Sequence, residues 1–216
     1  AESSAQEIPH LSIRVKQIDR FEANSLLIVI HVSNYQDARG GFWLMPEFGL
    51  EQDIYKQKSA KLYTSLVVIG VLIIVCLYHM IIYMQRPRDK SPLAFSLFCG
   101  IISMRESIIM GMGTFLGVSI DPDGYKLLKN FEYLALPLAV LAAAFYIKSM
   151  VPGRIFNLLY SWWIVPTCTI LVAFTVLVEP FTFTSYLYVY YVQTVSCVIV
   201  AVAHLCYQSF HKNKYR

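Results

Sequence analysis

The stretch LAFSLFCGIISMRESIIMGMGTFLGV (Leu93–Val118) is an apolar run that carries Arg105 and Glu106 near its middle. A helix crosses the roughly 30 Å hydrocarbon core of a membrane with about 20 apolar residues, so this run is long enough to span it. A cation in the middle of such a helix costs about 2.5 to 3.5 kcal/mol on insertion scales. We therefore expect the rest of the chain to build a protein environment around this charged pair.

The composition is that of a membrane protein. Hydrophobic residues make up 56% of the 216 residues and charged residues only 15%, whereas charged residues are about 25% of a typical soluble domain. The apolar residues are concentrated after Lys61, in runs as long as a membrane-spanning helix. We expect a mainly α-helical, polytopic bundle with five transmembrane helices in this chain. The expected spans are residues 62–84, 92–118, 125–150, 156–178 and 185–209.

Two stretches before these helices have the pattern of β-strands. Residues 11–18 alternate apolar and polar side chains, as a half-buried strand does, and residues 25–33 are apolar on both faces, as in a covered strand. So few strands cannot bury an apolar face by themselves. We expect region 1–57 to be the end of an extracytoplasmic β-sandwich and region 58–216 to be the helix bundle.

The charges of the connecting loops predict the orientation of the bundle. Lys and Arg in short loops are retained on the cytoplasmic side, and loops 119–124 and 179–184 contain acids but no Lys or Arg. The cations of the alternate loops and of the C-terminal segment are Arg86, Arg88, Lys90, Lys148, Arg154, Lys212, Lys214 and Arg216. This pattern predicts that the β region is extracytoplasmic and the C-terminus cytoplasmic.

Small residues form one face of the second expected helix. At about 100° per residue, they share a narrow stripe that allows close approach of a neighbouring backbone, which promotes helix association in lipid. The stripe consists of Ser96, Gly100, Ser103, Ser107 and Gly111. It would serve an internal helix contact or a homodimer equally well. Arg105 points to the opposite face, so this helix needs protein or water on two sides.

Arg105 requires a partner because a lone cation does not face lipid. The acids within reach are Glu106, the next residue, and Glu132 in the third expected helix. Two interpretations stay open at this stage. The pair either clamps two helices together or couples their packing to a signal.

Two histidines, His79 and His204, are expected about five residues from the cytoplasmic ends of their helices. They are a candidate proton-sensing pair, with interfacial hydrogen bonding as the alternative. Pro137 and Pro166 are expected to kink their helices. The residues contain no catalytic constellation and no cofactor or metal-binding motif. The net charge of +4 reflects loop cations that set topology, so we expect no nucleic-acid partner.

Three consecutive segments carry a family resemblance. They are HVSNYQDARGGFWLMPEFG (31–49), LEQDIYKQKSAKLY (50–63) and CLYHMIIYMQRPRDKSPLAFSLFCGIISMRES (76–107). In their sequence and order these three segments resemble the bacterial seven-transmembrane receptors with diverse intracellular signalling modules, the 7TM-DISM family. The matching residues are Asn34, Gly40, Gly41, Tyr78, His79, Tyr83, Arg88, Asp89, Leu93, Phe95 and Arg105.

The resemblance implies a fragment of a longer receptor. In this family a jelly-roll, carbohydrate-binding-like domain precedes seven helices, and a cyclase, histidine kinase or phosphatase module follows them. Residues 1–57 would then be the end of the jelly roll, and the bundle would contain five of the seven helices.

The expected function is that of a sensor in the bacterial inner membrane. It would pass a signal from an extracytoplasmic ligand, with carbohydrate as one candidate class, to a cytoplasmic module outside this chain. The expected partners also include membrane lipid and a second copy or a larger membrane complex. The alternatives are a non-catalytic structural or interaction subunit of an envelope assembly and, less favoured because no internal repeat is visible, a transporter.

Overall fold

The computed structural model describes residues 49–111 and 122–213. Every regular element in these ranges is helical, and five helices among them are long and apolar enough to cross a membrane. The prediction of a polytopic helical membrane fold is therefore confirmed. Both expected strands, 11–18 and 25–33, lie outside the described residues.

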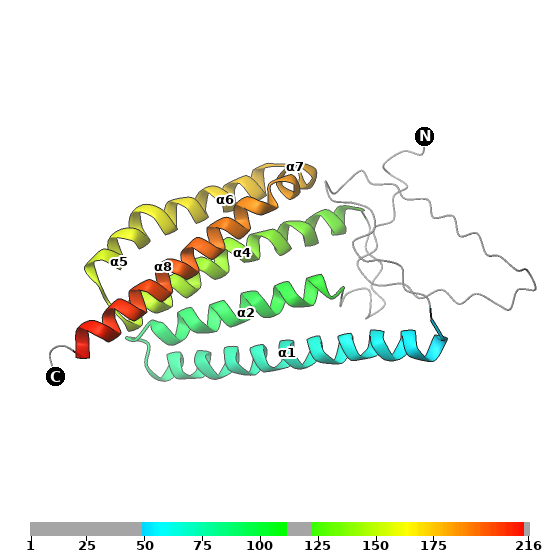
Figure 1. Ribbon diagram of the computed structural model, residues 1–216, viewed down its shortest axis with the longest axis horizontal. Helices are drawn as coiled ribbons and strands as arrows, with labels where there is room; N and C mark the ends of the chain where they lie inside the picture. Colours follow the sequence, from blue (N-terminus) through cyan, green and yellow to red (C-terminus); the bar gives the residue numbers. More distant parts are fainter. Residues whose placement is uncertain (1–48, 112–121, 214–216) are drawn as a thin grey trace, which may run out of the picture.

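The five spans run alternately in opposite directions (Figure 1). They are α1 (Glu51–Gln85), α2 (Ser91–Ile109), α4 (Pro122–Met150), the continuous segment of α5 (Arg154–Leu159), η2 (Tyr160–Ile164) and α6 (Val165–Leu177), and α8 (Leu187–Asn213). The short helix α7 (Pro180–Ser185) occupies most of the expected loop 179–184. α4 packs against α2, α6 and α8, whereas α1 packs mainly against α2. α4 is thus the central helix, and α2 has helical neighbours on two sides.

α1 begins earlier than the apolar run predicts. It starts at Glu51 instead of residue 62, so residues 51–57 are helical although they fall before the predicted boundary of the bundle. No Gly or Pro interrupts residues 51–69, and Glu51 and Asp53 in the first turn interact favourably with the positive end of the helix dipole. The helix therefore continues beyond the apolar run into a polar, exposed extension.

α2 ends nine residues before the predicted end at Val118. Its last helical residue is Ile109, and Gly111 follows with a φ of 67°, a left-handed conformation that glycine adopts without steric cost at helix C-termini. Residues 112–118 lie outside the described part of the chain. As a consequence, Arg105 is four residues from the end of α2 and not at its middle.

The fourth span contains a wider helical turn. In η2 the backbone N–H of Val165 donates to the carbonyl oxygen of Tyr160, five residues earlier. Pro166 follows at once; in a regular α-helix its ring would clash with the carbonyl of Trp162, and it has no N–H to donate. A π turn relieves both problems. Pro166 therefore follows a π turn in the fourth span, and Pro137 lies buried within α4.

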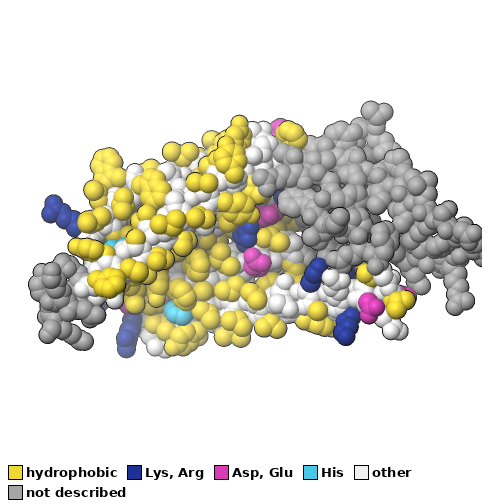
Figure 2. All heavy atoms as spheres, in the orientation of Figure 1, with side chains coloured by type: hydrophobic (Ala, Val, Ile, Leu, Met, Phe, Trp, Pro, Cys, Tyr) yellow, Lys and Arg dark blue, Asp and Glu magenta, His cyan; other side chains and the backbone are white. Residues whose placement is uncertain are grey.

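Two buried clusters hold α4, the fourth span and α8 together. The first consists of Val140, Ala144, Phe156, Ile164, Cys168 and Cys197. The second consists of Tyr133, Leu171, Phe183, Leu187 and Tyr190. Most other apolar side chains are exposed and cover the visible face between the two ends of the bundle (Figure 2), as expected for a surface that faces lipid.

Candidate functional site

Two ion pairs lie on the facing helices α2 and α4. Arg105 Nη1 donates to Glu106 Oε1 at 3.4 Å on α2, and Lys129 Nζ donates to Glu132 Oε2 at 3.0 Å on α4. We call these four residues the charged cluster. The Arg105 and Lys129 side chains are only 17% and 11% exposed. Figure 2 shows basic and acidic side chains gathered within an otherwise hydrophobic face.

The structure separates the two candidate partners of Arg105. Its ion pair is with Glu106, whereas Glu132 is paired with Lys129 on its own helix. In this arrangement each of the two ion pairs therefore lies within a single helix. Lys129 and Glu132 have i,i+3 spacing, which favours an ion pair on one helix and can be read from the sequence, although this pair was not among the predictions.

Hydrogen-bonding capacity remains unused near these charges. Arg105 Nε and Asn130 Oδ1 are buried and have no hydrogen-bond partner among the described residues. A buried polar group without a partner costs about 1 to 3 kcal/mol. Within the described ranges, one donor on α2 and one acceptor on α4 are thus buried at such a cost.

The small-residue stripe faces α1 along its first turns. Ser96 Oγ donates to the backbone oxygen of Cys76 at 2.9 Å, and a Cβ on Gly100 would lie 3.4 Å from Cys76 Sγ. Ser103 is also buried, and Ser107 Oγ donates to the backbone oxygen of Ser103 at 2.8 Å. Gly111, the last predicted member, ends the helix instead of packing within it.

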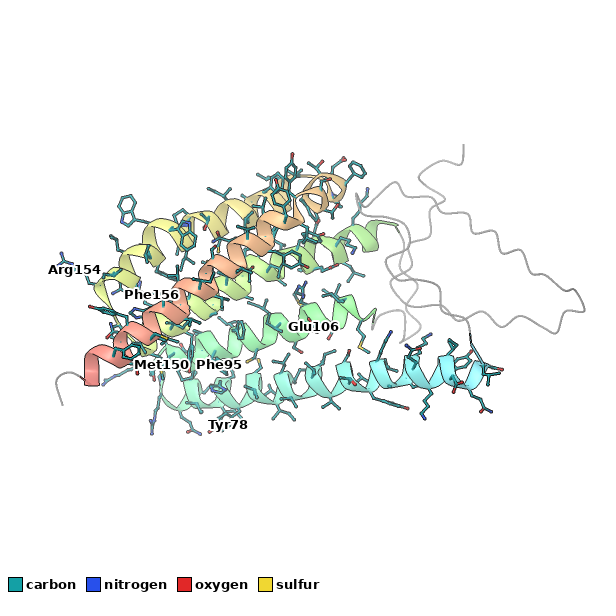
Figure 3. The ribbon with its side chains drawn as sticks, viewed as in Figure 1. Tyr78, Phe95, Glu106, Met150, Arg154 and Phe156 are labelled. Atoms are coloured by element: carbon teal, nitrogen blue, oxygen red, sulfur yellow. The ribbon has the colours of Figure 1, made fainter. Side chains whose placement is uncertain are left out.

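His79 and His204 have separate sets of partners. His79 on α1 bonds to the backbone oxygen of Val75 at 2.9 Å and meets Phe95 of α2 edge-on, with ring centroids 4.6 Å apart. Phe95, labelled in Figure 3, also contacts Tyr146 of α4. The structure therefore assigns His79 to an aromatic contact between α1 and α2.

His204 on α8 instead holds the connection between α4 and α5. Its Nε2 lies 2.9 Å from the backbone oxygen of Val151, which makes Nε2 the protonated nitrogen, and its ring stacks on Phe156 at 4.6 Å. No described contact joins His204 to His79. His204 thus forms a hydrogen bond between α8 and the connection that follows α4, and the proton-sensing role of the two histidines stays a prediction.

Buried polar side chains form hydrogen bonds between α6 and α8. We call this row of residues the seam, and it was not among the predictions. Thr175 Oγ1 and Tyr190 OH lie 2.6 Å apart, and Gln193 Nε2 donates to Thr167 Oγ1 at 2.6 Å. Thr167 also donates to the backbone oxygen of Trp163 in η2, at 2.6 Å. The seam thus connects α8 to the π turn. Gln193, an amide in the middle of an apolar run, was the signal that would have found it.

A sequence model of the family described as 7TM diverse intracellular signalling matches residues 61–216. The chain belongs to this family. No curated protein and no solved structure matches the chain.

The match to the 7TM diverse intracellular signalling family confirms the resemblance seen in the sequence. It begins at Lys61 within α1 and includes the four other spans, so the charged cluster, the stripe and the seam all lie inside it. Residues 1–57, predicted to be the end of a β-sandwich, lie before the match, and the jelly-roll part of the resemblance stays a prediction. The family is a sensory, signalling one, and the five apolar helices make the chain a multi-pass membrane domain.

Proposed function

We propose that this chain is the membrane sensor portion of a bacterial signal-transduction receptor. It would pass an extracytoplasmic ligand or partner signal through the helix bundle to a cytoplasmic output module outside the chain. The observation that carries this proposal is the charged cluster. Each of its ion pairs lies within one helix, while Arg105 Nε and Asn130 Oδ1 have no hydrogen-bond partner in the part of the chain that the structure describes.

The observed ion pair of Arg105 is weak enough that a second arrangement of the cluster can compete with it. In the observed one, Arg105 makes a long 3.4 Å contact to Glu106, which is 38% exposed. A contact of this length and exposure stabilises weakly, about 0 to 1 kcal/mol. In the second arrangement Arg105 would turn to Glu132 across the helix interface and release Lys129. An external ligand selects between them only if it binds one arrangement more tightly.

The charges at the ends of the bundle support the proposed orientation in the inner membrane. Arg86, Arg88 and Lys90 are exposed in the connection between α1 and α2, and Arg154 is exposed at the start of α5, at the same end of the bundle. At the opposite end, Glu179 before α7 is exposed and acidic. The exposed Lys56, Lys58 and Lys61 of the α1 extension lie at this opposite end too, so the asymmetry is confined to the connections between the spans. Those connections favour a cytoplasmic location for the first end.

Spin-label distances between α2 and α4 test the exchange of ion-pair partners. Labels at Leu97 and Leu138, which are exposed, would report two distance populations in the unmodified chain. Arg105→Gln or Glu132→Gln should leave one population, and the double variant should add nothing further, because both remove the same contact. The matched control Glu106→Gln removes the observed partner and should favour the second population. A single population that none of these variants alters would make the cluster a static clamp.

A second candidate function is an interaction subunit of a larger membrane assembly. It is favoured by α1, in which Ile69 is the buried residue and nearly all other apolar side chains are at least partly exposed. Such a surface fits a protein partner as well as lipid. The reading frame beyond Arg216 separates the two functions. A receptor requires an output module there, whereas an interaction subunit requires a stop.

A further inference from the structure

An open groove of about 480 Å³ lies on the outer face of α5 and η2. Its lining residues are Arg154, Ile155, Asn157, Leu158, Ser161 and Trp162. Phe156 and Ile164, on the other side of the same segment, are buried in the bundle. The groove therefore opens away from the helix bundle, toward the surroundings of the protein.

The groove is polar at one end and apolar along its walls. Arg154 is exposed, and Figure 3 shows it at the end of the bundle, pointing away from the helices. The Asn157 amide contributes a buried Oδ1 with no hydrogen-bond partner among the described residues. The apolar side chains Leu158 and Trp162 also line the groove, and both are exposed, Trp162 to 80%.

The positions of Arg154 and Trp162 along the membrane span indicate which kind of ligand would fit the groove. Arg154 is the first residue of the fourth membrane span, which places its guanidinium at the boundary of the hydrocarbon. Trp162 follows eight residues later, about 12 Å deeper at the helical rise. A ligand that fills the groove must carry an anion at the boundary and an apolar chain below it.

We propose that this groove binds an anionic phospholipid, with the phosphate on Arg154 and an acyl chain along Leu158 and Trp162. The guanidinium binds phosphate oxygens in a bidentate manner. The NH₂ group of Asn157, less than one helical turn deeper, adds a neutral donor to the same headgroup. Charge complementarity selects an anionic headgroup over a zwitterionic one. This inference goes beyond the proposed sensor function and does not depend on it.

Tryptophan quenching in vesicles tests the site. The chain is reconstituted in phosphatidylcholine that contains either brominated phosphatidylglycerol or brominated phosphatidylcholine at the same mole fraction, and Trp162→Phe provides the background from the other tryptophans. The Trp162 signal should show an apparent affinity for the anionic lipid about fivefold higher, the factor that one interfacial cation supplies. Equal quenching by both lipids would mean ordinary lipid contact and would overturn the proposal.

Two variants separate the site from the general charge of this end of the protein. Arg154→Gln should abolish the preference for anionic lipid, because the phosphate loses its cation. Arg88→Gln, which removes another exposed cation at the same end, should leave the preference unchanged. A preference that survives Arg154→Gln, or that Arg88→Gln removes equally, would contradict a specific site. Circular dichroism confirms that each variant keeps its helix content.

Discussion

The hydroxyl groups of Thr175 on α6 and Tyr190 on α8 share a hydrogen bond of 2.6 Å inside the bundle. Thr175 also donates its one hydroxyl proton to the backbone oxygen of Leu171, at 2.8 Å. Tyr190 is therefore the donor in the bond between the helices, and Thr175 accepts. Because both side chains are buried, neither hydroxyl has a solvent alternative in this arrangement.

Tyr190→Phe should lower the free energy of unfolding by about 0.6 to 1.7 kcal/mol, the range measured for hydrogen bonds between membrane helices. The ring keeps its apolar packing, so the loss reports on the hydroxyl alone. Chemical denaturation in detergent, followed by circular dichroism, measures it. The matched control is Tyr188→Phe on the same helix, because Tyr188 is 58% exposed and Tyr190 only 1%. Equal effects of the two variants would contradict a specific bond.

Gly153→Ala should destabilise the docking of α8 on the connection between α4 and α5. A Cβ at this position would lie 2.5 Å from His204 Cε1 and 3.0 Å from Gln208 Nε2, closer than atoms pack. The imidazole would have to move, which breaks its bond to the backbone oxygen of Val151. We expect a loss of about 1 to 3 kcal/mol, as for overpacked cores, measured by thermal unfolding.

A control variant and a double variant test whether the clash with His204 causes the loss of stability in Gly153→Ala. Gly70→Ala is the control, because a Cβ on Gly70 would meet nothing within 4 Å and alanine favours a helix over glycine. It should be neutral or stabilising. Combining Gly153→Ala with His204→Ala removes the clash, so the double variant should be more stable than the sum of the single losses predicts. Simple additivity would show that the ring and the glycine are not coupled.

The sequence predicted the number and type of membrane spans but not the depth of Arg105. Gly111 continues the spacing of Ser96, Gly100, Ser103 and Ser107, so a helical wheel cannot separate a packing glycine from a terminating one. What distinguishes them is the backbone conformation, a φ of 67° at Gly111. That conformation depends on where the chain turns. An apolar run limits the length of a helix without giving its last residue.

The seam between α6 and α8 could be predicted only in part. Gln193 in an apolar run indicates a polar contact, because an amide has no partner in lipid. Threonine gives no such signal, since its hydroxyl can bond within its own helix, as Thr175 does with the oxygen of Leu171. Which threonine also bonds to a neighbour depends on how the helices face each other. Local sequence does not contain that information.

Asp89 should make the start of α2 sensitive to acid. Ser91 donates both its side-chain hydroxyl and, at 2.9 Å, its backbone N–H to Asp89 Oδ1. These hydrogen bonds hold the pKa of Asp89 below its ordinary value. A lowered pKa in the folded state means that this stabilisation is present above the unfolded pKa, about 3.9. It is lost as the pH falls through the folded value.

Thermal unfolding of the chain and of Asp89→Asn between pH 7 and pH 2.5 measures this contribution. The unmodified chain should lose more stability than the variant as the pH falls below 4, because the amide of the variant keeps an acceptor oxygen that does not titrate. The difference between them should be constant above pH 5. Parallel curves at every pH would show that the carboxylate of Asp89 does not stabilise the helix start.

Gly100→Cys should form a disulfide with Cys76 within one chain. A Cβ on Gly100 would lie 3.4 Å from Cys76 Sγ, so small adjustments reach disulfide geometry. With the exposed Cys206 changed to Ser throughout, oxidation should shift the mobility of the monomer on a non-reducing gel. Leu97→Cys, on an exposed part of α2, is the control and should not react with Cys76. Because Gly100 belongs to the small-residue stripe, a disulfide-linked dimer of Gly100→Cys as the main product would mean that the stripe joins two copies instead of packing α2 against α1.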